Sequence, residues 1–368
     1  MKRYRVLTVV GARPQFIKAA LPSRLLRSRS SPLGEFLVHT GQHYDPEMSQ
    51  HLFDELGIPE PDVNLGVGSA SHAVQTAHML ERLERVALEQ RPDLMLIYGD
   101  TNSTLAGALV GAKLNVPVAH VEAGMRSHNR RMPEEINRII ADRLSQLLLC
   151  PSDSAVENLS REGITEGVHN VGDVMYDAVR HFSGLARRRY GRVYERWGLR
   201  RGEYMLLTVH RAENTDDPDR LRGLARLLAA IPRRVLFPVH PRTRERLREH
   251  RIGLPGNVAA TGPVSYLEML ALQAGASAVL TDSGGVQKEA YYLGKPCITL
   301  RTETEWTELV ELGWNRVVDL DMEQVLRAIE DIQRGLFPPR DAEHTPPYGD
   351  GNASRKIIDT ITCFLTGG

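Results

Sequence analysis

Short apolar runs rich in β-branched residues alternate along this chain with longer stretches whose apolar residues recur at helical spacing. The apolar runs are expected to form strands at Arg5–Val10, Phe36–Thr40, Leu94–Tyr98, Val116–Val121, Leu147–Cys150, Met205–His210, Val235–His240, Asn257–Ala260, Ala278–Thr281 and Pro296–Leu300. Helical patterns such as Ser71–Gln90 and Asp216–Ala230 separate them. Continuously apolar strands separated by helices are typical of parallel sheets covered on both faces. The alternation therefore predicts an α/β protein with doubly wound parallel sheets.

The same alternation occurs twice, on either side of a basic stretch with a helical pattern near Gly184–Gly202. A chain of 368 residues fits two domains at about 150 residues each. We place the first domain at residues 1–175 and begin the second at residue 176. Both are expected to be Rossmann-like, with a cleft between them. Ligands of such folds bind outside the carboxyl ends of the strands.

The charge balance and the cysteines limit the classes of partner. Lys and Arg number 46 and Asp and Glu number 46, so there is no bulk attraction for nucleic acid or an anionic membrane, and we expect neither partner. Cys150, Cys297 and Cys363 form no CxxC pair and no disulfide framework, which fits a reducing compartment. No apolar run approaches the about 18 residues of a transmembrane helix, and Arg13 comes too early for a signal peptide. We expect a cytoplasmic protein.

Two glycine-containing turns follow predicted strands and open predicted helices. Gly11-Ala12-Arg13-Pro14 follows the first strand, and Ser283-Gly284-Gly285 follows the strand that ends at Thr281. A helix start offers N–H groups and the positive end of the helix dipole, both of which suit phosphate. An ordinary strand-to-helix turn explains the first motif better, whereas the paired glycines of the second favour a pyrophosphate site. Glu289, further along the second helix, has two carboxylate oxygens for ribose hydroxyls.

Three carboxylates lie at predicted strand ends or helix starts of the first domain, namely Asp100, Glu122 and Glu134. Each has a structural explanation: Asp100 as part of a helix cap, Glu122 within a turn, and Glu134 in the first turn of a helix that begins at Pro133. Brought together at one site, the three would instead supply groups for general acid–base chemistry.

Other features of the chain are weaker. His210 and His240 end two predicted strands, where two histidines facing a phosphate site would donate hydrogen bonds or protons to it. Gly66-Val67-Gly68 is a partial dinucleotide pattern that follows no good strand, so we interpret it as a loop. The basic runs Arg187–Arg201 and Arg242–Arg251 are interrupted by acids and fit exposed helix faces. With no P-loop, HExxH or complete GxGxxG motif, we expect no metal and no cofactor.

The ordered set of segments GARPQFIK, TGQH, GDTNST, HVEAG, MPEEINR, HRAEN, PVHP, TDSGGVQKEA and PYGDGNAS resembles the non-hydrolysing UDP-N-acetylglucosamine 2-epimerase family over essentially the whole chain. The resemblance implies an isomerase that interconverts UDP-N-acetylglucosamine and UDP-N-acetylmannosamine for bacterial surface polysaccharides. UDP would be eliminated to leave a 2-acetamidoglucal and then added back with the opposite configuration at C2.

The family also implies an architecture and an assembly. The two Rossmann-like domains would adopt the GT-B arrangement, with residues 1–175 acting on the sugar and residues 176–352 binding UDP. A helix within residues 353–368 would cross back to the first domain. A homodimer is implied, with no metal and no cofactor.

Matching the family's motifs to this sequence assigns roles to individual residues. Asp100 and Glu122 would form the base and acid pair, Glu134 would be an additional acid or orienting group, and His210 would assist the departure of UDP. The positions expected to bind UDP or the sugar are Arg13, Lys18, Arg138, His240, Ser283, Gly284, Gly285 and Glu289.

Two segments depart from well-known bacterial members. Gln42-His43-Tyr44-Asp45 replaces QHRE, whose Arg-Glu pair belongs to an allosteric site in some of them. Trp306 replaces an arginine, in a form closer to relatives that act on UDP-2,3-diacetamido-2,3-dideoxyglucuronate. That uronate is the alternative substrate, and part of Arg126–Arg131 is expected to supply a cation for its carboxylate. A GT-B glycosyltransferase and a non-catalytic UDP-sugar sensor are further alternatives that the acid cluster disfavours.

Overall fold

The computed structural model describes residues 3–42, 52–338 and 347–367. The described residues form two compact units. Unit 1 comprises Met1–Ala178 together with Thr345–Gly368, and unit 2 comprises Val179–His344. The C-terminal segment therefore groups with the first unit, although the second unit precedes it in sequence.

Unit 1 is built on a parallel sheet with the strand order β3-β2-β1-β4-β5-β6-β7. Its strands are β1 (Tyr4–Val10), β2 (Leu33–His39), β3 (Val63–Asn64), β4 (Leu94–Tyr98), β5 (Val118–Val121), β6 (Leu147–Cys150) and β7 (Val168–Asn170). Its helices are α1 (Arg13–Leu26), α3 (His72–Gln90), α4 (Asn102–Lys113), α5 (Pro133–Leu144), α6 (Asp153–Arg161) and α15 (Ala353–Thr366), and α7 (Val174–Tyr190) continues into unit 2.

Unit 2 repeats the plan with the strand order β10-β9-β8-β11-β12-β13, again parallel throughout. Its strands are β8 (Tyr204–Thr208), β9 (Arg234–Pro238), β10 (Val258–Thr261), β11 (Ala278–Thr281), β12 (Cys297–Thr299) and β13 (Asn315–Val317). Its helices are the 3-10 helix η1 (Val193–Trp197), α8 (Ala212–Thr215), α9 (Pro218–Ala230), α10 (Pro241–Glu249), α11 (Tyr266–Gly275), α12 (Gly284–Tyr292), α13 (Thr307–Glu311) and α14 (Met322–Gln333).

The expected doubly wound α/β class is confirmed, and each predicted strand is present, most within one to three residues of the predicted ends. Every residue of β4 and of β8 is buried, as expected for central parallel strands covered on both faces. Sequence analysis missed β3, β7 and β13. All three lie at sheet edges and have only two or three residues, so they carry too few apolar positions to form a pattern.

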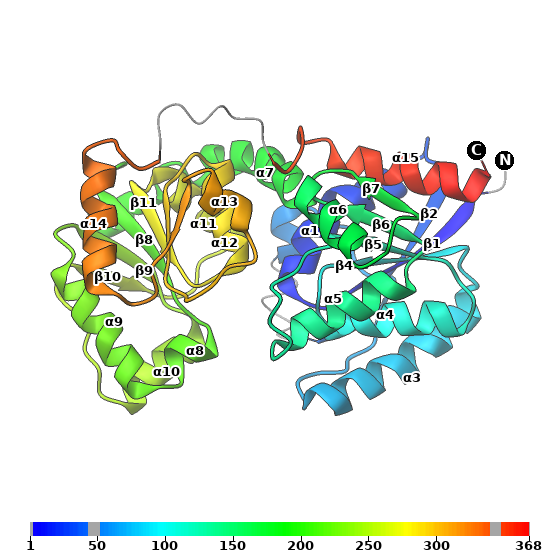
Figure 1. Ribbon diagram of the computed structural model, residues 1–368, viewed down its shortest axis with the longest axis horizontal. Coiled ribbons are helices and arrows are strands. Elements are labelled where there is room, and N and C mark those ends of the chain that lie inside the picture. The colour runs from blue at the N-terminus through cyan, green and yellow to red at the C-terminus, as the bar shows by residue number, and fades with distance from the viewer. Residues whose placement is uncertain (1–2, 43–51, 339–346, 368) are drawn as a thin grey trace. The chain divides into compact units, whose positions relative to one another are not determined.

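The helices of unit 1 divide between the two faces of its sheet (Figure 1). Helices α3, α4 and α5 pack side by side on one face, and α1 packs with α15 on the other. Under the first group lies a continuous apolar core that includes Leu83 of α3, Ile97 of β4 and Ala108 of α4. Unit 2 has a corresponding core that includes Leu224 of α9, Phe237 of β9 and Val325 of α14.

The strand order fixes where a ligand site can form. In unit 1 the order reverses between β1 and β4, and in unit 2 it reverses between β8 and β11. The crevice at such a reversal, outside the carboxyl ends of the strands, is the usual binding site of a doubly wound sheet. The segments after these four strands are the GARPQ, GDTNST, HRAEN and TDSGG motifs.

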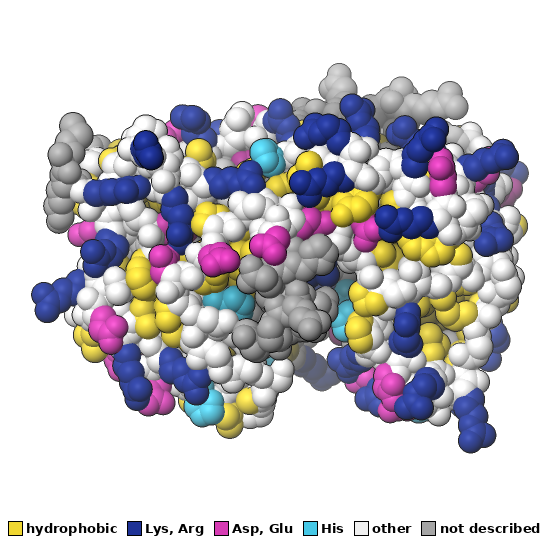
Figure 2. Space-filling view, turned by 180° about the vertical axis from the view of Figure 1, so that it is seen from behind, with side chains coloured by type: hydrophobic (Ala, Val, Ile, Leu, Met, Phe, Trp, Pro, Cys, Tyr) yellow, Lys and Arg dark blue, Asp and Glu magenta, His cyan; other side chains and the backbone are white. Residues whose placement is uncertain are grey.

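The surface does not gather its charges of one sign into a single patch. Figure 2 shows Lys and Arg side chains spread over one face, with Asp and Glu between them. On α10 the arginines are paired with acids, as in Arg248–Glu245 at 2.6 Å and Arg246–Glu249 at 2.9 Å. This agrees with the interpretation of the Arg242–Arg251 run as an exposed helix face. No helix within the described residues has both the length and the apolar character needed to cross a membrane.

The C-terminal helix α15 is attached to unit 1 by a carboxylate from another helix. Its N-cap residue, Asn352, makes no side-chain capping bond. Instead, Asp177 in the first turn of α7 accepts the N–H groups of Ala353 at 3.1 Å and Ser354 at 2.7 Å. Asp177 is buried, so this charged cap is protected from water.

We predict that Asp177→Ala lowers the free energy of unfolding of unit 1 by about 1–3 kcal/mol, because two buried N–H groups at the start of α15 lose a charged acceptor. Hydrogen exchange of the α15 amides, together with denaturant unfolding, measures the change. Asp350→Ala is the control. Asp350 is exposed, and its side chain accepts the N–H of Asn352, the residue before α15. Equal exchange rates of α15 in wild type and the Asp177 variant would contradict the prediction.

Candidate active site

The carboxylate of Asp100 lies directly after β4 and is paired with an arginine from α5. The Arg138 guanidinium donates to Asp100 Oδ2 at 2.6 Å and 3.1 Å, and Asn137 Nδ2 donates to the Asp100 carbonyl at 2.9 Å. The expected cap of α4 is made by the neighbouring residue instead, because Thr101 Oγ1 accepts the N–H of Thr104. Asp100 is therefore free of the capping role and is 30% exposed.

Glu122 lies in the turn after β5 and forms an ion pair with Lys18 of α1. It has φ 72°, an uncommon left-handed conformation for a residue other than glycine. The pair lies against Gly99, since a Cβ placed there would be 3.2 Å from Lys18 Nζ and 3.4 Å from Glu122 Oε2. Gly99 precedes Asp100, so the Lys18–Glu122 pair lies against the residue before Asp100, at the ends of the neighbouring strands β4 and β5.

The two glutamates at the start of α5 have different surroundings. Pro133 is at the first helical position, as expected, and both Glu134 and Glu135 lie in the first turn. The side chain of Glu134 is exposed and makes no hydrogen bond or ion pair with any of the described residues. It is four residues before Arg138, which places the two on the same face of the helix.

Glu135, in contrast, is buried and structural. It accepts the N–H of Ser127 at 2.9 Å and of His128 at 3.0 Å, and Arg138 Nη1 donates to it at 2.8 Å. Burial alone would raise the pKa of Glu135, but the bonds from Ser127 and Arg138 outweigh it and lower the pKa below its ordinary value. Arg138 therefore bridges a structural carboxylate and the Asp100 carboxylate.

The basic segment between Glu122 and Glu134 is only partly available to a ligand. Arg126 is buried and donates to Asp142 Oδ2 at 2.7 Å and to both carboxylate oxygens of Glu162 at 2.7 Å and 2.9 Å. It is thus removed from the candidates for binding a substrate carboxylate. Arg130 and Arg131 are exposed, as is Arg13 at the first position of α1.

In unit 2 a buried aspartate organises the turn that carries His210. Asp282, directly after β11, accepts the N–H of His210 at 3.1 Å and of Arg211 at 3.0 Å, and Asn214 Nδ2 donates to it at 3.1 Å. The His210 ring lies beside that of His240, with 5.7 Å between the centroids. Loss of water around the ring lowers the pKa of His210, and the Asp282 carboxylate opposes this only in part. His210 is therefore mainly neutral at neutral pH.

The Ser283-Gly284-Gly285 turn opens α12, as expected, with Ser283 at the N-cap. A Cβ at Gly284 would be 2.3 Å from Glu305 Oε1, so a larger residue there would have to displace the Glu305 carboxylate. At Gly285, by contrast, no heavy atom lies within 4 Å of the added Cβ. The second glycine therefore presents its backbone to open space, where a ligand phosphate can approach it.

Glu289 lies one turn further along α12. It is buried, and Gln273 Nε2 of α11 donates to its Oε2 at 2.6 Å. This bond fixes the orientation of the carboxylate.

Trp306 is buried and lies against the Ser-Gly-Gly turn. The Lys288 ammonium lies 3.9 Å from the centre of its ring, a cation–π contact. The indole Nε1 of Trp306 would be 3.4 Å from a Cβ placed at Gly284. The neighbouring Glu305 pairs with Arg301 at 2.8 Å, and although burial raises the pKa of Glu305, Arg301 and Arg211 lower it overall. The substitution at position 306 thus bears on the Ser-Gly-Gly turn of unit 2, the turn expected to bind phosphate, and the sequence did not reveal this contact.

The polar residues that follow β2 are partly structural. Gln42 is buried, and its Oε1 accepts the N–H of Ser103 at 3.0 Å and the hydroxyl at 2.7 Å. His43, Tyr44 and Asp45, which carry the departure from the QHRE motif, lie outside the described residues. The expected loop at Gly66-Val67-Gly68 is confirmed.

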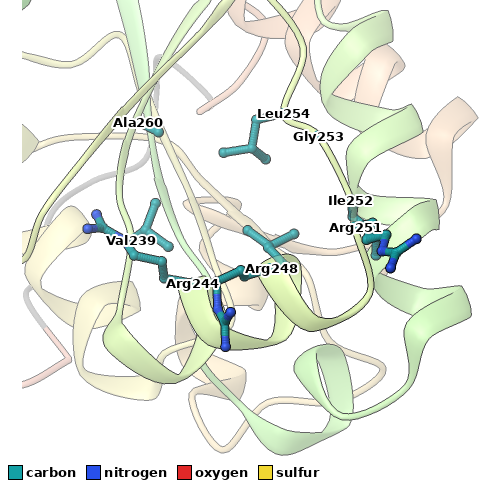
Figure 3. Close-up of a pocket in the computed structure, with 9 residues that line it drawn as sticks. Val239, Arg244, Arg248, Arg251, Ile252, Gly253, Leu254 and Ala260 are labelled. Atoms are coloured by element: carbon teal, nitrogen blue, oxygen red, sulfur yellow. The ribbon is translucent and has the colours of Figure 1, made fainter.

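A separate hollow of about 530 Å³ lies in unit 2 between α10, the segment after it and edge strand β10. Its walls are apolar side chains such as Val239 and Leu254, with arginines at the rim, and Figure 3 shows Arg251 extending away from Val239. None of the candidate site residues lines it. Within residues 3–42, 52–338 and 347–367, no group of three or more His, Cys, Asp or Glu is arranged to hold a metal ion.

Comparison with known proteins gives one family. The family profile described as "UDP-N-acetylglucosamine 2-epimerase" matches residues 27–362. A Methanococcus maripaludis protein named UDP-N-acetylglucosamine 2-epimerase homolog is 46% identical, over 97% of this chain and 99% of its own length. The UDP-2,3-diacetamido-2,3-dideoxy-D-glucuronate 2-epimerase of Pseudomonas aeruginosa is 44% identical, over 97% of this chain and 99% of its own.

A solved structure agrees over the whole chain. The crystal structure of the Methanocaldococcus jannaschii UDP-GlcNAc 2-epimerase, in complex with UDP-GlcNAc and UDP, superimposes with a TM-score of 0.88 at 39% identity. The alignment covers 97% of this chain and 99% of that one. With the two parallel sheets, the paired carboxylates of unit 1 and the Ser-Gly-Gly turn of unit 2, these matches establish that the chain is an isomerase of the UDP-N-acetylglucosamine 2-epimerase family.

Proposed function

We propose that this protein interconverts UDP-N-acetylglucosamine and UDP-N-acetylmannosamine by elimination and re-addition of UDP. The observation that carries the proposal is that two carboxylates, Asp100 and Glu122, follow the neighbouring strands β4 and β5, and that each is paired with a cation. A UDP-sugar has chemically distinct ends, and the chain has a set of residues suited to each. Unit 1 acts on the sugar, and unit 2 binds the nucleotide.

The elimination needs a base for the hydrogen at C2 while the C1–O bond to UDP breaks. One of Asp100 and Glu122 removes this proton, and the electron pair of the C–H bond forms the C1–C2 double bond of the glycal. UDP then adds back to C1, and the other carboxyl group delivers a proton to the opposite face of C2. Glu134, on the same face of α5 as Arg138, is the additional acid or orienting group.

The departing UDP must be held in place for re-addition. Ser283, Gly284 and Gly285 present the start of α12 to the diphosphate, and Glu289, oriented by Gln273, accepts the ribose hydroxyls. His210 and His240 follow the ends of β8 and β9 and assist the departure of UDP by donating hydrogen bonds to the phosphate.

Two observations favour the uronate as a second candidate substrate. The Pseudomonas aeruginosa relative named for it is 44% identical to this chain. In addition, Arg130 and Arg131 are exposed in the segment that Glu135 anchors through the N–H groups of Ser127 and His128. An arginine there would bind the C6 carboxylate and would penalise the neutral sugar if left unpaired.

We further propose a cytoplasmic homodimer that makes precursors of a surface polysaccharide. The cysteines support a reducing compartment, since Cys150 and Cys297 are buried thiols and Cys363 is also free. For the homodimer, Val74 and Leu88 of α3 are exposed apolar side chains that a partner copy would cover.

The test of the proposed function is incubation with each candidate UDP-sugar in deuterated water, followed by NMR at C2. We expect UDP-N-acetylglucosamine to epimerise and the product to carry deuterium at C2, because the proton returned to C2 comes from a group that exchanges with solvent. Product that keeps all its original hydrogen would exclude elimination and re-addition. A higher kcat/KM for the uronate, lost in Arg130→Ala or Arg131→Ala, would instead assign the second substrate.

We predict that Asp100→Asn, Glu122→Gln and Glu134→Gln each lower kcat by about 10²–10⁴-fold, because each keeps the side-chain shape but removes the acid–base group. Steady-state kinetics measures the effect, and circular dichroism checks the fold. Asp153→Asn is the matched control, since Asp153 is an exposed acid in the first turn of α6 in the same unit. A variant that turns over like wild type would identify its residue as purely structural.

Removal of the Glu289 carboxylate should weaken UDP binding. We expect Glu289→Ala to cost about 1.5–3 kcal/mol of UDP binding free energy, the range for a hydrogen bond to a charged group, as measured by calorimetry. Glu330→Ala serves as the control, because Glu330 is an exposed residue of α14 that pairs with Arg334. Unchanged affinity in the Glu289 variant would place the ribose elsewhere.

A further inference from the structure

His120, in the middle of the HVEAG motif, is completely buried between two hydrogen-bond acceptors. Its Nδ1 lies 2.7 Å from Asp142 Oδ1 of α5, and its Nε2 lies 2.7 Å from the carbonyl oxygen of Gly99. Neither the ring nor the Asp142 carboxylate is exposed to solvent. The ring therefore joins the end of β4 to α5 across strand β5.

The Nε2 nitrogen acts as a donor in this arrangement. A carbonyl oxygen can only accept, so Nε2 carries a hydrogen. Nδ1 faces the Asp142 carboxylate, which also accepts from Arg126 Nη1 at 2.7 Å. Burial alone would raise the pKa of Asp142, but His120 and Arg126 outweigh it and lower the pKa below its ordinary value.

The contacts continue from Asp142 through Arg126 to Glu162. His120, Asp142 and Arg126 are buried, whereas the Glu162 side chain is 29% exposed. Arg126 therefore gives the buried Asp142 carboxylate a second partner besides His120.

The carbonyl that His120 holds belongs to the peptide that leads into Asp100. Gly99 has φ 62°, a backbone conformation that glycine adopts without strain, and its N–H donates to Val121 O at 2.9 Å. Gly99 is therefore held on both sides, by Val121 through its N–H and by His120 through its carbonyl, and the second bond orients the Gly99–Asp100 peptide. The Lys18–Glu122 pair lies against the same glycine.

Asp142 also makes a hydrogen bond to the turn after β5, which carries Glu122. Its Oδ2 accepts the N–H of Gly124 at 3.2 Å, in the turn that carries Glu122. Asp142 and Arg138 lie four residues apart on α5, which places them on the same face of the helix. One buried network thus connects the backbone at Asp100, the backbone near Glu122 and the helix that supplies Arg138.

We propose that His120 is a positioning residue for the epimerisation, which fixes the Gly99–Asp100 peptide so that the Asp100 carboxylate and the Lys18–Glu122 pair keep their relative placement. It touches neither substrate nor reacting atoms. This inference rests on the proposed function for its kinetic consequence, but the hydrogen bond to Gly99 can be tested without any substrate.

The two amide replacements of histidine separate its two bonds. The amide nitrogen of Gln takes approximately the place of Nε2 and can still donate to Gly99, whereas that of Asn takes the place of Nδ1 and reaches only Asp142. We expect His120→Asn to lower kcat on the order of 10²-fold, the cost of a small misplacement of a catalytic group. His120→Gln should retain most of the activity, and KM and the affinity for UDP should change little in either variant.

Thr8→Val is the control for a general loss of stability in unit 1. Thr8 lies in the same sheet and donates a buried hydrogen bond to Glu35 at 2.8 Å, away from the Gly99 turn. It should lower thermal stability without changing kcat. Equal kcat losses in the Asn and Gln variants, or full activity of the Asn variant, would overturn the proposal, provided that the wild type is active.

Nitrogen NMR of protein labelled in its histidine rings gives a readout that is independent of activity. For His120, assigned by its absence in His120→Gln, we expect a hydrogen bonded to Nε2, the nitrogen that faces the Gly99 carbonyl. In His120→Asn the amide signal of Asp100 should move, and in His120→Gln it should stay near its wild-type position. An Nε2 without a hydrogen, or an unmoved Asp100 amide in the Asn variant, would refute the positioning role even if the enzyme is active. An inactive wild type in which these signals appear as expected would refute the proposed function alone.

Discussion

Parallel pairing of the strands is the constraint on which the rest of this structure depends. When all strands of a sheet run the same way, their carboxyl ends lie along one edge, and a reversal of strand order opens a crevice there. Each unit therefore gathers residues that are far apart in sequence: Gly11 follows β1 and Asp100 follows β4, while His210 follows β8 and Asp282 follows β11. The chemistry of the site comes from loops, whose placement the two buried sheets determine.

Placing charges in these loops requires partners for them, because an isolated buried charge is strongly unfavourable. Unit 1 meets this requirement with linked pairs: Arg138 connects Glu135 to Asp100, and Arg126 connects Glu162 to Asp142. Unit 2 uses backbone donors as well, since the N–H groups of His210 and Arg211 point to Asp282. Removing one partner of a buried pair typically costs about 3–5 kcal/mol. Residues that do not touch substrate are thus as firmly constrained as those proposed to do so.

The fold and most motif positions could be predicted because they rest on local signals. Apolar runs such as Leu94–Tyr98 mark central strands, and Pro133 or Ser283 mark helix starts. The edge strands were missed because two or three residues carry no periodicity. The partners of the carboxylates proposed to be catalytic could not be derived either, since the Lys18–Glu122 pair joins residues 104 positions apart. Spacing alone did not distinguish Glu134 from Glu135, although one is exposed and the other anchors a loop.

The pairing of both carboxylates with cations suits a reaction that must run in both directions. Under the proposed mechanism, the group that takes the proton from C2 in one direction delivers it in the other, so neither Asp100 nor Glu122 can be specialised as acid or base. A pair of carboxyl groups in unlike surroundings, one apolar and one polar, divides the two roles permanently. Here each carboxylate has a cationic side chain as an ion-pair partner, Arg138 for Asp100 and Lys18 for Glu122. In the proposed mechanism, the configuration of the sugar at C2 then decides the direction of proton transfer.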